Sequence, residues 1–93
     1  MDISVIIPLY NEAESLPELT QWIERVMKEN SFTYEIIFIN DGSTDNSWDV
    51  IEQLKEKNDC IHGIKFRRNY GKSPALYCGF ERAKGDVVIT MDA

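Results

Sequence analysis

Four short apolar segments alternate along this chain with three segments whose apolar residues recur every three or four positions. The apolar segments lie at Ile3–Tyr10, Tyr34–Ile39, Ile61–Phe66 and from Asp86 onward. Nearly continuous apolar runs of this kind are typical of buried strands covered on both faces of a sheet. The last of them is expected to be a buried strand that carries Asp92 to its carboxyl end. Pro8 cannot donate a hydrogen bond to a neighbouring strand, so the first strand is predicted to end there.

The segment after the first strand is predicted to be an amphipathic helix. Ser15 and Glu18 fit a capping box, and Pro17 occupies the first turn, where its missing N–H costs nothing. The apolar residues then follow helical spacing and form a single stripe, made of Leu16, Leu19, Ile23, Val26 and Met27.

Two further helices are predicted. One runs from about Asn46 to Lys57 and turns an apolar side inward, formed by Trp48, Ile51 and Leu54. The other starts at Lys72 or Ser73 and ends at Gly85, and its apolar side is expected to consist of Leu76, Phe80 and Ala83.

The element order βαβαβαβ predicts an α/β fold. Because crossovers between parallel strands are right-handed, this order favours a Rossmann-like parallel sheet with helices on both faces. If the chain reverses after the third strand, the strand order is 3-2-1-4 and the fourth strand lies beside the first. A ligand crevice is then expected at the carboxyl ends of the strands, between Tyr10–Glu12 and Asp92, with Asp41 one strand away.

Composition narrows the possible partners. A chain of 93 residues with a net charge of −6 is expected to form one domain and not to bind nucleic acid in general. Its basic residues are nevertheless uneven, because four of the ten lie within eight positions that hold no acid: Lys65, Arg67, Arg68 and Lys72. Such a strip on an acidic chain suits a small anionic ligand.

The two cysteines and one histidine do not have the spacing of a zinc site. Cys60, Cys78 and His62 are therefore interpreted as core or surface residues of a reduced, cytoplasmic chain. No apolar run approaches the length of a membrane span, and no signal peptide opens the sequence.

Three familiar site motifs are excluded by particular residues. The first strand-to-helix turn, Tyr10–Glu14, contains no glycine, so it is not a dinucleotide-binding fingerprint. Gly71-Lys72-Ser73 resembles the end of a P-loop, but Phe66 stands where that motif needs its upstream glycine. A Ser-His-Asp set is absent because the only histidine lies within a predicted strand.

What remains at the strand ends is the aromatic ring of Tyr10 and the carboxylates of Glu12, Asp41 and Asp92, with cations nearby. Carboxylates can accept hydrogen bonds from a base or ribose and can bind a divalent cation, an aromatic face can stack on a base, and Lys72 and Arg68 can neutralise a diphosphate. These residues predict a metal-assisted nucleotide site. Spacing alone supports equally well a structural interpretation, in which Asp41 forms a turn, Glu12 starts a helix and Tyr10 packs.

Four motifs in order carry a resemblance to a known family. They are Val5-Ile6-Ile7-Pro8-Leu9-Tyr10-Asn11-Glu12, Ile39-Asn40-Asp41-Gly42-Ser43-Thr44-Asp45, Arg68-Asn69-Tyr70-Gly71-Lys72, and Gly85-Asp86 leading to Met91-Asp92-Ala93. Together they resemble the N-terminal half of a family 2 glycosyltransferase, over essentially all 93 residues. Within that family the chain is most similar to dolichyl-phosphate mannose synthases and bacterial polyprenyl-phosphate glycosyltransferases.

The resemblance implies a GT-A fold, a UDP- or GDP-sugar donor and a divalent cation, Mg²⁺ or Mn²⁺. It implies that Pro8 and Tyr10 line the base pocket and that Glu12 reaches the base or ribose. Asp41 would accept from a base N–H, and Lys72 would lie near the diphosphate. Asp92 matches the first aspartate of the Asp-x-Asp motif, which contacts the nucleotide and helps to hold the metal. Many relatives have a second aspartate where this chain has Asn40.

By the same resemblance, residues 1–93 are expected to be a single nucleotide-sugar-binding subdomain cut inside the Asp-x-Asp motif, whose second aspartate would come after Ala93. Such a fragment is expected to be inactive by itself and to self-associate through an exposed sheet edge. The parent would transfer a sugar to an acceptor, polyprenyl phosphate in this branch. It would work in the cytoplasm, at the membrane's cytoplasmic face, with membrane attachment only through parts outside this sequence.

Two other functions compete with this expectation. A nucleotidyltransferase would need a first loop rich in glycine and arginine, which Tyr10–Glu14 does not supply. A non-catalytic acidic α/β binding module, similar to a receiver domain, would bind cations without responding to nucleotides.

Overall fold

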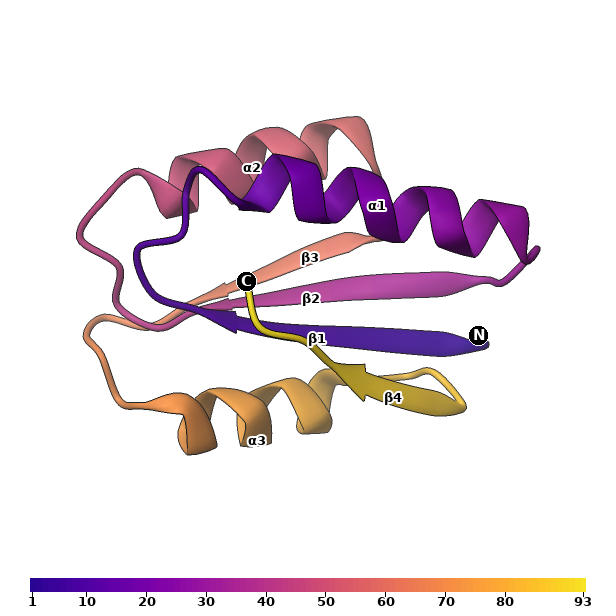
Figure 1. Ribbon diagram of the computed structural model, residues 1–93. Coiled ribbons are helices and arrows are strands. Elements are labelled where there is room, and N and C mark those ends of the chain that lie inside the picture. Colours follow the sequence, from indigo (N-terminus) through magenta and orange to yellow (C-terminus); the bar gives the residue numbers. More distant parts are fainter.

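The computed structural model describes all 93 residues and confirms the predicted order of elements (Figure 1). No helix combines the length and the apolar character that crossing a membrane requires. The elements are β1 (Ile3–Leu9), α1 (Leu16–Glu29), β2 (Tyr34–Asn40), α2 (Ser47–Lys57), β3 (Ile61–Lys65), α3 (Lys72–Arg82) and β4 (Val87–Thr90).

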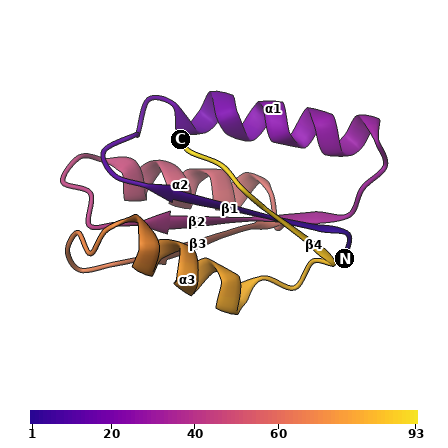
Figure 2. The same cartoon turned by 60° about the horizontal axis from the view of Figure 1, so that its bottom comes forward.

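The four strands form one parallel sheet in the order β3-β2-β1-β4, as predicted. Helices α1 and α2 cover one face and α3 covers the other (Figures 1 and 2). Leu9 of β1 pairs with Asn40 of β2, so the residues that follow each strand leave the sheet side by side. This register places the first two strand-to-helix loops next to each other, at the carboxyl end of the sheet.

The core has two layers because β1 and β2 are covered on both faces. Val5, Ile7 and Phe38 pack under α1 and α2, where Ile23 and Ile51 meet them. The layer beneath α3 is formed by Ile6, Ile37, Ile39 and Ala75. Continuous apolar runs in the two central strands therefore reflect burial from two sides.

The predicted capping box at the start of α1 is wrong, although the helix begins where predicted. Ser15 has helical backbone angles, φ −84° and ψ −20°, and its side chain caps no backbone amide. Its hydroxyl instead donates to Glu12 Oε2 at 2.8 Å. The serine is drawn back to the preceding loop because a carboxylate acceptor lies there.

The predicted apolar side of α3 is only partly right. Phe80 is 51% exposed, and the residues that the helix buries are Ala75 and Gly79. A Cβ at Gly79 would lie 2.4 Å from Cγ2 of Ile6. The helix therefore approaches β1 through its smallest side chains, and Phe80 is turned away from the sheet.

β4 is an edge strand and not the buried strand that its sequence predicts. Val87 and Val88 are 54% and 41% exposed, because no strand pairs with the outer side of β4. β4 therefore pairs with β1 on one side only, and its apolar run does not indicate burial.

A buried carboxylate fixes the connection between α3 and β4. Glu35 Oε2 accepts hydrogen bonds from Ser4 Oγ at 2.6 Å and from the Lys84 amide at 2.7 Å. Ser4 Oγ in turn accepts from the Gly85 amide at 2.8 Å. The chain thus enters β4 along a path set by β1 and β2.

Candidate functional site

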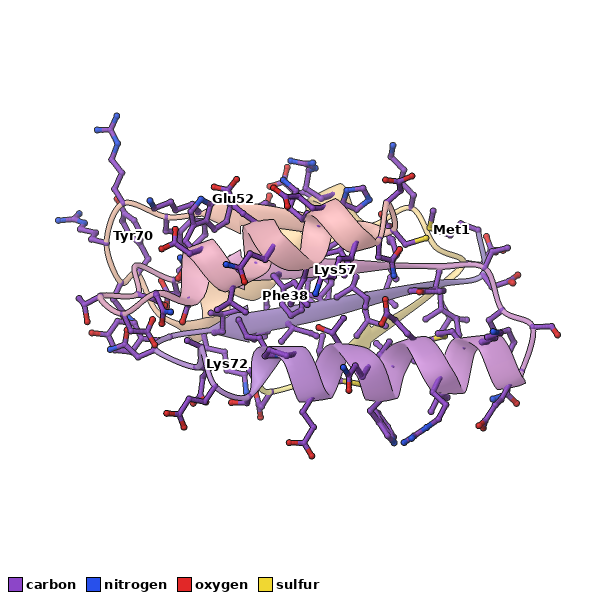
Figure 3. The ribbon with its side chains drawn as sticks, turned by 90° about the horizontal axis from the view of Figure 1, so that it is seen from above. Met1, Phe38, Glu52, Lys57, Tyr70 and Lys72 are labelled. Carbon is purple, nitrogen blue, oxygen red and sulfur yellow. The ribbon has the colours of Figure 1, made fainter.

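A pocket of about 250 Å³ lies at the carboxyl ends of β1 and β2. Four of the six predicted nucleotide-binding residues line it, together with three that were not singled out: Pro8, Tyr10, Asp41 and Lys72, with Leu9, Asn69 and Gly71. Figure 3 shows Tyr70 and Lys72 at this end of the molecule and Met1 at the other. The sheet topology therefore brings together residues more than 60 positions apart in the sequence.

One wall of the pocket is the loop after β1. Tyr10 presents a half-exposed ring, and the chain turns at Asn11, whose φ is +54°. Asn11 Oδ1 accepts from the Thr44 amide at 2.8 Å and from the Asp45 amide at 3.2 Å. An asparagine tolerates this left-handed backbone, and its side chain fastens the loop after β1 to the loop after β2.

Asp45 adds a second fastening between the same two loops. Its carboxylate accepts from the hydroxyl and amide of Ser47 and from the Ala13 amide. The side-chain hydrogen bond from Ser47 is the main reason that the pKa of Asp45 lies below its usual value of 3.8. The rim of the pocket is therefore held by a group that is ionised at neutral pH.

The opposite wall is held by Asp41, which is only 5% exposed. Its Oδ1 accepts from the Tyr70 amide at 2.7 Å and its Oδ2 from the Gly71 amide at 3.0 Å. Asp41 therefore positions the loop that leads into α3, besides lining the pocket.

Gly42 allows that loop to lie directly on the end of β2. Its φ is +71°, and a Cβ there would lie 2.2 Å from the carbonyl carbon of Arg68. The amide of Phe66 also donates to the carbonyl of Asn40 at 2.9 Å. Residues 66–71 thus pack directly against the turn after β2, which explains why a glycine follows Asp41.

The start of α3 gives the pocket a positive side. Gly71 precedes the helix with φ +101°, and no side chain caps the first amides of the helix. Lys72 is the first helical residue, and the Arg68 guanidinium lies 4.9 Å from the centre of the Tyr70 ring. Uncapped helix amides and nearby cations form an environment that favours an anion.

Asp92 lies outside this pocket but is joined to it through an ion pair. Lys72 Nζ is 2.8 Å from Asp92 Oδ1. Asp92 lines a larger cavity of about 540 Å³ beside the start of α1, where Figure 2 shows the C-terminus. The remaining lining residues of that cavity are Ser15, Glu18, Leu19, Gln21, Trp22, Arg25 and Ala93.

Glu12 is the one predicted site residue that lines neither cavity. Its carboxylate accepts the Ser15 hydroxyl, and its amide donates to Ser47 Oγ at 3.2 Å. In this structure the hydrogen bonds of Glu12 stabilise the loop before α1.

No three histidine, cysteine or acidic side chains converge anywhere in the chain, so Asp92 has no second protein ligand beside it for a divalent cation. Mg²⁺ commonly binds through one or two carboxylates and completes its shell with water and substrate phosphates. Asp92 therefore fits a cation that is shared with a bound diphosphate.

Asn69 and Gly71 are pocket residues that sequence reasoning did not assign. Both lie inside the motif Arg68-Asn69-Tyr70-Gly71-Lys72, so the motif itself was the available signal. Their contribution comes through the backbone at Gly71 and through the position of Asn69, and residue chemistry alone does not reveal such roles.

Comparison with known proteins shows relatives along almost the whole chain. It is 45% identical over 92 residues to an undecaprenyl-phosphate 4-deoxy-4-formamido-L-arabinose transferase of Pseudomonas fluorescens (strain SBW25). The match covers 98% of this chain and 27% of that relative. The 93 residues thus span about a quarter of the length of such relatives.

Two solved structures share the fold. TarS 1-349 of S. aureus, solved in complex with UDP, matches with a TM-score of 0.75 and 25% identity, over 99% of this chain and 27% of TarS 1-349. The mannosyltransferase PcManGT of Pyrobaculum calidifontis, in complex with GDP-Man and Mn²⁺, matches with a TM-score of 0.77 and 23% identity. That match covers 97% of this chain and 26% of PcManGT. These likenesses confirm the predicted GT-A fold.

The family model described as "Glycosyl transferase family 2" matches residues 4–93. This match includes every residue of the pocket and the ion pair between Lys72 and Asp92. It favours the glycosyltransferase prediction over the nucleotidyltransferase and the non-catalytic module. The chain belongs to glycosyl transferase family 2.

Proposed function

We propose that these 93 residues form the nucleotide-sugar-binding part of an enzyme that transfers a sugar from a UDP- or GDP-linked donor to polyprenyl phosphate. The observation that carries the proposal is the 250 Å³ pocket, where Tyr10, Asp41 and Lys72 meet at the carboxyl ends of adjacent parallel strands. Ligands of open α/β sheets bind at such edges.

The base and ribose are assigned to the side of the pocket nearest β1. The half-exposed ring of Tyr10 offers a stacking face, and Pro8 lines the same side. Asp41 Oδ1 and Oδ2 each accept one amide, and a carboxylate has about four acceptor positions. Asp41 therefore retains acceptors for a base N–H. Glu12 does not line this pocket, but its carboxylate accepts only the Ser15 hydroxyl and so also retains acceptors for a base or ribose group.

The diphosphate is assigned to the start of α3. The first amides of this helix lack a side-chain cap, and Lys72 supplies a full positive charge beside them. When bound at Asp92, a divalent cation would neutralise the charge that develops on the departing diphosphate. Asp92 and Lys72 are the residues that would share the two charges of such a complex.

The acceptor half of the reaction is assigned to parts of the protein outside residues 1–93. The relative from Pseudomonas fluorescens is named for undecaprenyl phosphate, and this name supports the proposed polyprenyl-phosphate acceptor. Since the chain spans only 27% of that relative's length, the 93 residues are proposed to bind the donor without transferring sugar by themselves. The complete enzyme would act at the cytoplasmic face of a membrane.

The proposal is tested by amide NMR titration of the ¹⁵N-labelled chain with UDP and with GDP, each with Mg²⁺. We expect one nucleotide to shift the signals of Tyr10, Asp41, Gly71 and Lys72, and its identity gives the base of the donor. A dispersed spectrum that moves with neither nucleotide, both in this chain and in a chain extended past Ala93, would overturn the proposal. Sugar transfer by the 93-residue chain would overturn its predicted inactivity.

A further inference from the structure

We infer that the ion pair between Lys72 and Asp92 couples the binding of the divalent cation to the binding of the nucleotide diphosphate. In the free protein Lys72 is the counter-ion of Asp92. In the complex Lys72 exchanges Asp92 for the diphosphate, and Asp92 exchanges Lys72 for the cation. The inference rests on the proposed donor site and adds an order of events to it.

The geometry of the pair supports this exchange. Lys72 Nζ and Asp92 Oδ1 are 2.8 Å apart, and both side chains are largely exposed to solvent. Lys72 comes from the start of α3 and lines the nucleotide pocket, whereas Asp92 follows β4 and lines the neighbouring cavity. The pair therefore stands between the two cavities, and each charge is partly neutralised by the other until a ligand replaces it.

The charges explain why one ligand alone binds poorly. A cation placed on Asp92 lies next to the Lys72 ammonium and is repelled until Lys72 moves. A diphosphate that attracts Lys72 leaves the Asp92 carboxylate unpaired beside a polyanion. When both ligands bind, every charge has an opposite neighbour. The contact between His62 Nε2 and Glu35 Oε1, at 3.5 Å, involves residues that line neither of these cavities.

Exposure sets the size of the effect. The side chains of Lys72 and Asp92 are 62% and 77% exposed. Exposed ion pairs contribute little to stability, so this pair can be exchanged readily and its coupling is about two- to fivefold in affinity. By thermodynamic linkage, the cation strengthens nucleotide binding by the same factor as the nucleotide strengthens cation binding.

The test measures each ligand alone in the 93-residue chain and in two variants. In Lys72→Met the competing ammonium is gone, so Mn²⁺ alone should bind at Asp92 about two- to fivefold more tightly. The readout is paramagnetic broadening of the Asp92 and Ala93 amide signals. The same variant should bind the nucleotide more weakly. Lys57→Met makes the same change of charge at an exposed site at the end of α2 and should change neither affinity.

The reciprocal variant is Asp92→Asn, which frees Lys72. Without any metal, this variant should bind UDP or GDP about two- to fivefold more tightly than the unchanged chain. Both side chains are exposed, so neither variant should affect folding, and dispersed spectra verify this.

The outcomes separate this inference from the proposed function. If Lys72→Met weakens nucleotide binding but binds Mn²⁺ alone no more tightly than Lys57→Met, the exchange is wrong and the donor site stands. If the unchanged chain and an extended chain bind no nucleotide, the proposed function fails. In that case the Mn²⁺ affinities of the two lysine variants still decide whether Lys72 competes for Asp92.

Discussion

The carboxylate of Asp41 receives the backbone amide of Tyr70 at 2.7 Å, across 29 positions of sequence. Asp41 directly follows the second strand, and Tyr70 belongs to the loop that leads into the third helix. A residue expected to contact a ligand base is therefore also what holds the opposite wall of its pocket.

Replacing Asp41 by Asn should lower the free energy of unfolding by about 1–3 kcal/mol, because the new amide group can accept only one of the two backbone hydrogens and turns a donor toward the other. Urea denaturation measures this loss. Asp59→Asn, which changes the same chemical group at an exposed position between α2 and β3, is the control and should leave stability nearly unchanged. Equal stabilities for the two variants would contradict the role assigned to Asp41.

Gly42→Ala should destabilise the chain more than Gly71→Ala. Both glycines have positive φ, +71° and +101°, so each substitution strains the backbone by about 1–3 kcal/mol. Only at Gly42 does the added methyl group also meet the backbone of Arg68, whereas a Cβ at Gly71 meets nothing within 4 Å. Thermal unfolding of both variants tests the order, and a larger loss for Gly71→Ala would show that residues 66–71 do not rest on Gly42.

Asp45 makes the rim of the pocket sensitive to acid. Its pKa in the folded chain lies below 3.8, so its contribution to stability is present above pH 3.8 and is lost as the pH falls through the folded pKa. The stability difference between the unchanged chain and Asp45→Asn should be constant from neutral pH to about pH 5 and should shrink below pH 3.8. Urea denaturation along a pH series measures it. A difference that grows on acidification would have the wrong sign.

The outer edge of β4 should make the 93-residue chain self-associate. The amides of Val87 and Met91 donate to the carbonyls of Asp2 and Ile6, so the backbone of Val88, which alternates with them, faces away from the sheet. Unpaired apolar edges recruit other strands, and a charged side chain prevents this. Val88→Lys should reduce association in sedimentation velocity, whereas Val88→Thr, which adds no charge, should reduce it less. A chain that is monomeric before any substitution would refute the expectation.

The order of strands and helices was predictable because the apolar periodicity changes between strands and helices and because crossovers are right-handed. The sequence predicted less well which residues of each element are buried. Phe80 looked like a core residue by spacing, yet α3 contacts the sheet through Ala75 and Gly79. Periodicity marks which residues are apolar, and it does not report how closely two elements approach.

The site was predictable as a set of residues and less so as a set of contacts. Pro8, Tyr10, Asp41 and Lys72 do converge on one pocket. The hydrogen bonds of Asp41 to Tyr70 and Gly71, and of Glu12 to Ser15, depend on loop paths that single residues do not encode. The ion pair of Lys72 with Asp92 joins the start of α3 to the residues after β4, two consecutive elements whose outer ends meet only once β4 has paired with β1.

Because Gly79 has no side chain, α3 can lie directly against Ile6 of β1. Any Cβ at this position would push against Ile6 and lift the helix from the sheet. Lys72 lies seven residues toward the other end, roughly 10 Å along the axis at the rise of an α-helix. A substitution that tilted α3 at Gly79 would therefore also displace the Lys72 ammonium at the pocket, although the two residues do not touch.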